Sequence, residues 1–440
     1  MSDLAIGLVS FPVLLGLIFL RVPIGLAMFV MALGGLYAIT DGTAMALSRL
    51  KNEPFSTFSS YSLSIVPMFL LMGHFATLGG MSQALFKAAE AWLGHRKGGV
   101  AMAAVGACAG FGAICGSSLA TAATMGQVAL PELRRQGYAG GFSTATLAAG
   151  GTLGILIPPS VILVIYAILT EQNIAKLFLS AVVPGVLAAV GYMITIAIYV
   201  RLNPGAAQHR EALPLRLRMR ALADVWPVLL VFLLVVGGIY MGWFTPTEGA
   251  AVGAFGTGVI ALLNGGLTRV RLMQAFYATA RNSAMIFFIV LGAALYNGFL
   301  ALSQVPQELS AWVVGQGMSP WAVLACILAL YLVFGCLMDS LSMILLTIPI
   351  FFPIISVLDF GLTAEETAIW FGILVLIVVE VGLITPPVGM NLFVINSMDP
   401  QTRILDTYKA VLPFVISDIV RVMILVAAPG ITLFLMRLMH

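Results

Sequence analysis

Long apolar segments recur along almost the whole chain, and short polar or Gly/Pro-rich stretches separate them. Segments such as Leu4 to Leu20, Ala181 to Val200 and Trp226 to Trp243 are close to the ~20 residues that a helix needs to cross a bilayer. No basic region precedes the first segment, so we expect it to remain as a helix and not to be removed as a signal peptide. The pattern predicts an all-α polytopic membrane protein.

Two pairs of apolar segments are too short to cross a bilayer comfortably, and a Gly- or Ser-containing tip separates the members of each pair. The first pair is 99–114 and 119–132, and the second is 320–334 and 341–355. Each pair predicts a re-entrant hairpin. Non-helical backbone at membrane depth is tolerated only inside protein or along a water-filled cavity, because its polar groups need partners. Both tips are therefore candidates for a transport pathway.

A double proline follows each predicted hairpin, in the motifs Gly-Ile-Leu-Ile-Pro-Pro and Gly-Leu-Ile-Thr-Pro-Pro. Proline lacks a backbone donor and disrupts a helix interior, so we expect Gly150 to Ser160 and Gly382 to Val388 to be unwound. Aligning the prolines pairs Gly154 with Gly382 and Ile157 with Thr385. The shared spacing indicates an internal repeat, as in many secondary transporters, although a single Pro-Pro more often marks an ordinary kink.

Only 9% of the residues are charged and 61% are hydrophobic, whereas an ordinary soluble domain has about 25% charged residues. Basic residues cluster in the linker 201–225 and flank the first hairpin, whereas no Lys or Arg lies between Leu302 and Gln401. The positive-inside rule then places the linker and the feet of the first hairpin in the cytoplasm and the feet of the second hairpin outside. The repeat is predicted to be inverted. The linker residues, which include Arg210 and Glu211, also fit an amphipathic surface helix.

The unwound segments should free backbone carbonyls, which bind small hard cations such as sodium. Gly154 and Gly382 are the main candidates. Hydroxyls from Ser117, Ser118, Thr121, Ser340 and Thr385 supplement them, and Asp339 adds charge. Such hydroxyls often bond the preceding turn of their own helix instead. The half-helix N-termini at Ser160 and Asn391 point toward an anionic solute. Our candidates for contact with the solute are Thr121, Ser160, Ser340 and Asn391.

Ionisable residues inside a membrane are costly and indicate function by default. Glu380 adjoins the second break and has two interpretations, a proton or cation site, or a partner within the helix bundle for Arg281 or Arg421. Asp418 and Arg421 are three residues apart on one helical face and are expected to neutralise each other. No Gly-x4-Gly-Lys-Ser/Thr loop or His-Glu-x-x-His motif is present, so an ion gradient is the expected energy source. An intramembrane enzyme and a passive channel are the alternatives from other classes.

These motifs resemble the large membrane subunit of the tripartite ATP-independent periplasmic (TRAP) transporters. The resemblance extends over nearly the full chain and rests on 65–73, 112–121, 150–160, 244–251, 338–342 and 382–393, above all on Phe-Thr-Pro-Thr-Glu and Gly-Leu-Ile-Thr-Pro-Pro. It implies a sodium-coupled importer in a bacterial inner membrane, working with a small four-helix membrane subunit and a periplasmic substrate-binding protein. Organic acids such as dicarboxylates, keto acids and sugar acids are the implied substrates. A stand-alone sodium/dicarboxylate symporter remains the alternative.

The resemblance also implies roles for residues and segments. The implied sodium ligands are Ser117, Ser118, Gly154, Ile157, Pro159, Gly335, Asp339, Gly382, Thr385 and Val388. An elevator mechanism is implied, with scaffold helices in 1–98, a first transport repeat in 99–200 (hairpin 99–132, broken helix 142–170), a linker in 201–225, further scaffold helices in 226–318, a second transport repeat in 319–400 (hairpin 319–356, broken helix 366–397) and a C-terminal helix in 401–440. Glu380 stands where the family often has a neutral residue.

Overall fold

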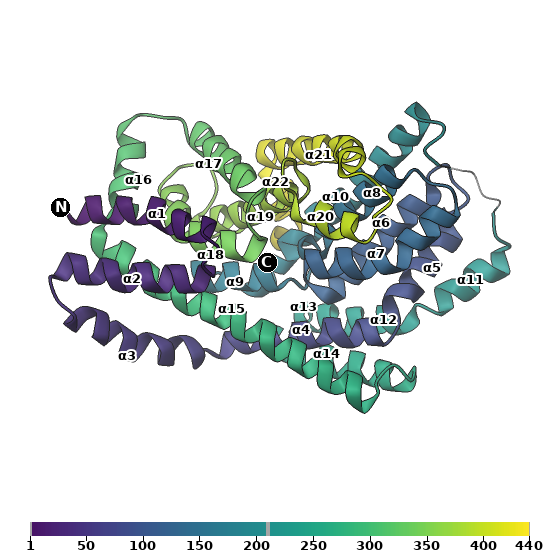
Figure 1. Ribbon diagram of the computed structural model, residues 1–440, viewed down its shortest axis with the longest axis horizontal. Coiled ribbons are helices and arrows are strands. Elements are labelled where there is room, and N and C mark those ends of the chain that lie inside the picture. Colours follow the sequence, from purple (N-terminus) through teal and green to yellow (C-terminus); the bar gives the residue numbers. More distant parts are fainter. Residues whose placement is uncertain (1, 208–211, 440) are drawn as a thin grey trace.

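The computed structural model describes residues 2–207 and 212–439, and every regular element in those ranges is helical (Figure 1). The all-α prediction is confirmed. Within the described ranges, six helices are long and apolar enough to cross a membrane, and the number is up to eight if each bent helix pair is one span. The chain is thus a multi-pass membrane protein. Arg210 and Glu211 of the predicted linker lie outside the described residues.

The helices before the linker fall into an N-terminal group and a first hairpin with its broken helix. The N-terminal group is α1 (Asp3–Phe19), α2 (Ile24–Thr40), α3 (Ala44–Phe58), the short 3-10 helix η1 (Tyr61–Ser64), α4 (Ile65–Leu78) and α5 (Met81–Leu93). The next group is α6 (Gly99–Cys115), α7 (Ser118–Arg135), α8 (Gly140–Leu156), α9 (Val161–Thr170) and α10 (Ile174–Leu202).

The rest of the chain contains the linker helix, a further group of helices and the second hairpin with its broken helix. It begins with α11 (Leu215–Ala223), α12 (Trp226–Phe232), the π-helical turn η2 (Leu233–Gly237), α13 (Gly238–Tyr240), α14 (Pro246–Leu263), α15 (Arg269–Ser303) and α16 (Val305–Gly315). It ends with α17 (Pro320–Gly335), α18 (Ser340–Ser356), α19 (Ala364–Ile384), α20 (Met390–Ser397), α21 (Ile404–Ala427) and α22 (Pro429–Met439).

The long helix α15 runs obliquely past the hairpins and broken helices and packs against α2 and α4 (Figure 1). Among the hairpins and broken helices, α8 packs against α6, α7 and α21, and α19 packs against α17 and α18. Every residue of α19 from Thr367 to Ile384 is buried. A polar group on this helix therefore has no access to solvent and must find its partners inside the protein.

The breaks are shorter than the sequence suggested. We expected unwinding from Gly150, but α8 continues to Leu156, and only 157–160 are non-helical. Likewise, α19 continues through Gly382 to Ile384. A proline disfavours helical backbone chiefly at the residue before it, and both Ile157 (ψ 120°) and Thr385 (ψ 128°) are extended. The peptide bonds Pro158–Pro159 and Pro386–Pro387 are cis.

Three further boundaries bear on the predicted segments. The first tip is only Gly116 and Ser117, because α6 continues to Cys115 and Gly116 takes the left-handed backbone (φ +63°) that ends many helices. The prediction of a single helix in 401–440 is wrong. Two helices are present, because Pro429 restricts the preceding residue and cannot continue α21. In the linker, α11 has no buried residue, as expected of a surface helix.

Candidate functional site

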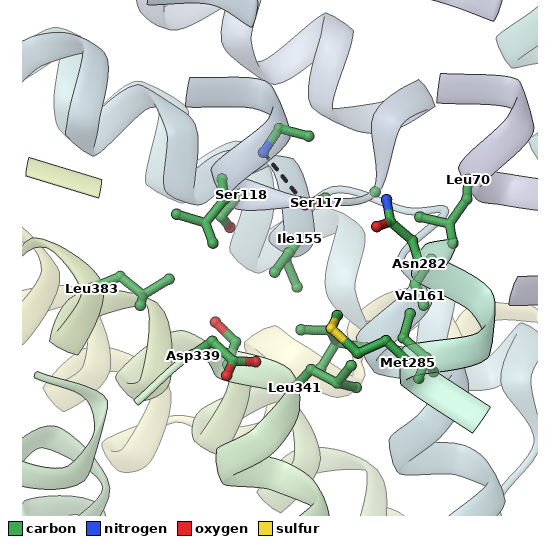
Figure 2. Close-up of a pocket in the computed structure, with 16 residues that line it drawn as sticks. Leu70, Ser117, Ser118, Ile155, Val161, Asn282, Met285, Asp339, Leu341 and Leu383 are labelled. Carbon is green, nitrogen blue, oxygen red and sulfur yellow. Dashed lines mark hydrogen bonds between the residues drawn. The ribbon is translucent and has the colours of Figure 1, made fainter. Parts of the chain in front are cut away.

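A cavity of about 340 Å³ lies where both hairpin tips meet α15 and α4 (Figure 2). Its wall combines both halves of the chain. The lining residues include Gly116 and Ser117 of the first tip with 118–120 of α7, Asp339 of the second tip with 340–341 of α18, Val161 and Ile162 at the start of α9, Asn282, Met285 and Ile286 from α15, and Leu70 from α4. Three helices, α7, α9 and α18, begin at or beside this wall. The partial positive charge of three helix N-termini therefore acts on the same space.

Glu380 connects the two tips from behind the cavity. Its carboxylate accepts hydrogen bonds from the hydroxyl of Ser118 and from the hydroxyl of Ser340, the latter at 2.7 Å. Glu380 is 1% exposed, and no ion pair joins it to a described Lys or Arg. Neither Arg281, which is exposed, nor Arg421 is its ion-pair partner.

Arg421 instead forms an ion pair with Asp418 at 2.9 Å, as expected from their spacing on α21. Tyr192 donates a hydrogen bond to the other oxygen of the Asp418 carboxylate at 2.7 Å, and its hydroxyl is 3.0 Å from that of Thr152 on α8. The opposite charges compensate each other, but the geometry is imperfect, because Asp418 Oδ1 and the Arg421 nitrogens make no hydrogen bond among the described residues. Two of the intramembrane charges, Asp418 and Arg421, therefore have a structural role as each other's partners.

Oxygen atoms converge on Gly154 near the first break. A Cβ atom placed on Gly154 would lie 2.4 Å from the hydroxyl oxygen of Thr121 and 2.9 Å from the backbone carbonyl of Ser117. The Thr121 hydroxyl is fully buried and has no hydrogen-bond partner among the described residues. Across the tip, the carbonyl of Pro159 approaches Gly116. Hydroxyl and carbonyl oxygens of this kind are the ligands that hard cations prefer.

At the second break, the side-chain oxygens of the predicted sodium ligands already have hydrogen-bond partners. Gly382 contacts the backbone of Gly335, but the Thr385 hydroxyl donates to the carbonyl of Val381 at 2.6 Å. The Asp339 carboxylate caps α18, accepting hydrogen bonds from the backbone amide of Ser342 at 3.0 Å and from its hydroxyl at 2.5 Å. Oxygen lone pairs remain on both side chains, so each keeps some capacity to bind a cation.

Val388 is the remaining predicted sodium ligand at the second break, and the Tyr408 hydroxyl uses part of the acceptor capacity of its carbonyl. This hydroxyl donates to the carbonyl of Pro387 at 2.6 Å and lies 3.3 Å from that of Val388. The chain that follows the double proline is therefore fixed by α21, since Tyr408 lies on that helix.

The four residues predicted to contact the solute do not all lie at the cavity. Ser340 lines the cavity, and Ser160 caps α9 next to Val161. Thr121 is fully buried beside Gly154 and does not line the cavity. Asn391 is also fully buried, and its amide donates to the carbonyl of Ala148 at 3.3 Å. Asn391 thus contacts α8 and does not line the cavity.

The structure adds Asn282, which the sequence analysis did not single out. Its side-chain amide turns from α15 toward the first hairpin tip (Figure 2). The other α15 and α4 residues on the wall, Leu70, Met285 and Ile286, are apolar. The available signal was the polar triplet of Arg281, Asn282 and Ser283 inside an otherwise apolar segment.

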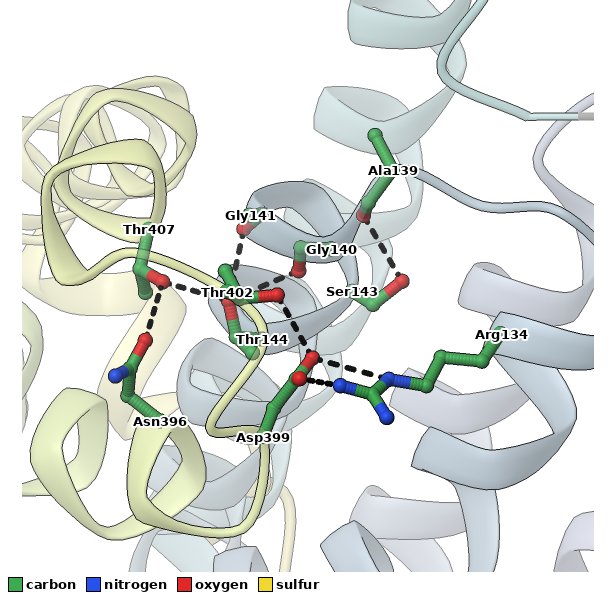
Figure 3. A network of polar contacts seen from close by, with 10 residues as sticks. All are labelled: Arg134, Ala139, Gly140, Gly141, Ser143, Thr144, Asn396, Asp399, Thr402 and Thr407. Atoms are coloured by element: carbon green, nitrogen blue, oxygen red, sulfur yellow. Dashed lines mark hydrogen bonds and ion pairs between the residues drawn. The ribbon is translucent and has the colours of Figure 1, made fainter.

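At the opposite end of α7, a polar network joins the two halves of the chain (Figure 3). Arg134 forms an ion pair with the fully buried Asp399, which also accepts a hydrogen bond from Thr402 at 2.8 Å. Beside it, the hydroxyls of Thr144 on α8 and Thr407 on α21 are 2.8 Å apart. The network fixes the foot of the first hairpin to the segment after α20.

Comparison with known proteins gives a consistent result. A family model described as "Tripartite ATP-independent periplasmic transporter, DctM component" matches residues 11–431. The chain is 37% identical over 406 residues to the C4-dicarboxylate TRAP transporter large permease protein DctM of Pseudomonas aeruginosa, covering 92% of each chain. It is 31% identical to the isethionate TRAP transporter permease protein DctMQ of Oleidesulfovibrio alaskensis, covering 96% of this chain and 66% of that protein.

Among solved structures, the chain resembles the YdaH transporter of Alcanivorax borkumensis, with a TM-score of 0.65. The match covers 88% of this chain and 89% of that one at 14% sequence identity. At this identity the likeness concerns the fold alone.

Proposed function

Because the chain belongs to the TRAP transporters as their large permease, the DctM component, we propose that it imports a small organic acid across a bacterial inner membrane and couples this import to sodium. As a permease it is not an enzyme. The observation that carries the proposal is the cavity itself, where both hairpin tips, oxygen-rich and next to two double-proline breaks, face helices of the surrounding scaffold.

We place the first sodium site around Gly154, with Ser117, Ser118, Ile157 and Pro159. The buried Thr121 hydroxyl without a partner supports this placement, because a bound cation would satisfy it. The Ser117 carbonyl beside Gly154 already accepts from the backbone amide of Thr121 at 2.9 Å, and its second lone pair is available to the same cation. Thr121 thus joins the proposed sodium ligands and leaves the group of solute contacts.

The second sodium site is proposed at Gly335, Asp339, Gly382, Thr385 and Val388. Asp339 supplies a formal charge that the first site lacks, and it lines the cavity. Its carboxylate also caps α18, so binding a cation there would have to share oxygens with the cap. The two proposed sites are therefore chemically different.

An organic acid fits the proposed pathway because the N-termini of α7 and α9 meet at the cavity and favour an anionic group. The Asn282 amide adds a donor from the scaffold side. The names of two relatives also specify organic acids, a C4-dicarboxylate and isethionate. We further propose that a substrate-binding protein delivers the solute, that a small membrane subunit braces α1 to α5 and α14 to α16, and that the hairpins and broken helices move as an elevator.

Uptake in proteoliposomes tests the proposal. The chain is reconstituted with its small membrane subunit, and labelled solute is added with the binding protein under an inward sodium gradient. Accumulation should require the gradient and the binding protein. Unchanged accumulation without sodium would refute the coupling, and full uptake without the binding protein would favour the stand-alone symporter.

A further inference from the structure

We propose that Glu380 is a positioning residue that holds the two hairpin tips on one carboxylate and fixes the direction in which the Ser118 and Ser340 hydroxyls face. This inference rests on the proposed transport function and adds a residue that the sodium and solute assignments above do not contain. It also changes the chemistry expected of Ser340.

The three residues come from separate elements that only the fold brings together. Ser118 begins α7, Ser340 begins α18, and Glu380 lies four residues before the end of α19. Ser118 and Ser340 lie 262 and 40 residues from Glu380 in the chain. All three are buried, with exposed fractions of 1%, 4% and 1% for Ser118, Ser340 and Glu380. The carboxylate cannot turn to solvent, because the surrounding residues of α19 are buried as well.

Ser118 and Ser340 are the hydrogen-bond partners of the Glu380 carboxylate among the described residues. The other buried charges on the facing helix α21, Asp418 and Arg421, are paired with each other. A buried carboxylate without an ion-pair partner is stable only if donors satisfy its oxygens. The hydroxyls of Ser118 and Ser340 each satisfy one oxygen, so both tips gain from staying in contact with Glu380.

A serine hydroxyl has one hydrogen to donate and two lone pairs that accept. Since both hydrogens are given to Glu380, Ser118 and Ser340 present only lone pairs to the cavity side. They can bind a cation or accept from a hydroxyl of the solute, but they cannot donate to its carboxylate. The carboxylate of the solute must then be held by other donors. These are the Asn282 amide and the first backbone amides of α7 and α9, which have no acceptor within their own helices.

The isosteric variant Glu380→Gln tests this arrangement. Glutamine can accept from one serine, but its amide group must donate to the other, which turns one hydroxyl around while keeping size and packing. We expect the sodium concentration for half-maximal uptake to rise about tenfold, equivalent to about 1.4 kcal/mol of lost binding. Ser118→Ala and Ser340→Ala should each raise it too, whereas Ser356→Ala, at the exposed end of α18, should behave as wild type.

The double variants with Glu380→Gln separate positioning from a general loss of structure. If Glu380 acts through the serines, the effects of Ser118→Ala and Glu380→Gln are non-additive. Thermal unfolding in detergent should stay close to wild type for Glu380→Gln. Wild-type sodium dependence of Glu380→Gln, or strictly additive effects, would overturn the inference. If wild-type uptake proves independent of sodium, the proposed coupling fails, and the same variants are scored by their half-saturating solute concentration, where no change overturns the positioning role.

Discussion

Gly112 on the first limb of the first hairpin lies directly against Gly154 on the broken helix. A Cβ atom on Gly112 would be 2.5 Å from the Cα of Gly154. In the second half, a Cβ atom on Gly382 would be 2.5 Å from the Cα of Gly335. Each hairpin therefore touches its broken helix through backbone atoms, at Gly154 and Gly382, which the alignment of the double prolines pairs.

Gly112→Ala should destabilise the protein, because backbone atoms would have to shift to admit a methyl group. Overpacking of this kind costs about 1–3 kcal/mol. The measurement is thermal unfolding in detergent, together with uptake. Gly34→Ala is the matched control, since nothing lies within 4 Å of its Cβ position and alanine favours a helix. Equal stability of both variants would contradict the close contact.

Thr121→Val should separate stability from ion binding. The Thr121 hydroxyl has no partner, so removing it should leave stability unchanged or raise it by about 1 kcal/mol. As a sodium ligand, its loss should raise the half-saturating sodium concentration by about tenfold. Thr146→Val is the matched control, because Thr146 on α8 is equally buried and equally unpartnered. A sodium requirement that both variants leave unaltered would remove Thr121 from the site.

Asn282→Leu should weaken solute binding, because it removes the polar side chain that α15 contributes to the cavity wall. Losing one hydrogen bond to a charged group costs about 1.5–3 kcal/mol, which predicts a half-saturating solute concentration roughly 10- to 150-fold higher. Labelled-solute uptake at saturating sodium measures it. The exposed neighbour variant Arg281→Gln should stay within about twofold of wild type on the scale of a surface substitution. Equal solute affinity in Asn282→Leu and wild type would argue against contact.

Arg134→Ala should destabilise the contact between the end of α7 and the segment after α20, because it leaves the buried carboxylate of Asp399 without its cation. Breaking a buried ion pair costs about 3–5 kcal/mol, and the partial exposure of Arg134 places the expected loss nearer 2 kcal/mol. Asp399→Asn in the same chain should restore part of the unfolding temperature, since it removes the unpaired charge. An Arg134→Ala protein as stable as wild type would show that the ion pair contributes nothing.

The elevator proposal predicts alternating exposure of the cavity. Ala120 is exposed on the first turn of α7 and lines the cavity, so an Ala120→Cys reporter should react with a membrane-impermeant maleimide. Of the native cysteines, only Cys326 is exposed, and it is first replaced by alanine. The labelling rate from one side of the vesicle should change at least severalfold when sodium and solute-loaded binding protein are added. A constant rate from both sides would indicate a fixed pore.

The sequence by itself determined the helical class, the two hairpins, the two breaks and the pairing of Asp418 with Arg421. These features are local: apolar length, a missing backbone donor at proline, and a spacing of three residues on one helix are all present within a few turns. The extent of unwinding was overestimated for the same reason, since proline acts mainly on its immediate predecessor.

The tertiary structure alone decided the partners of Glu380, the position of Asn282 on the cavity wall, and the burial of Asn391 against α8. Each of these depends on contacts between segments distant in the chain. The sequence showed that Glu380 was an unusual charge but could not choose between a cation and two hydroxyls as its partners. That choice follows from the position of Glu380 on α19, within hydrogen-bonding distance of Ser118 and Ser340, because a buried carboxylate takes the donors within its reach.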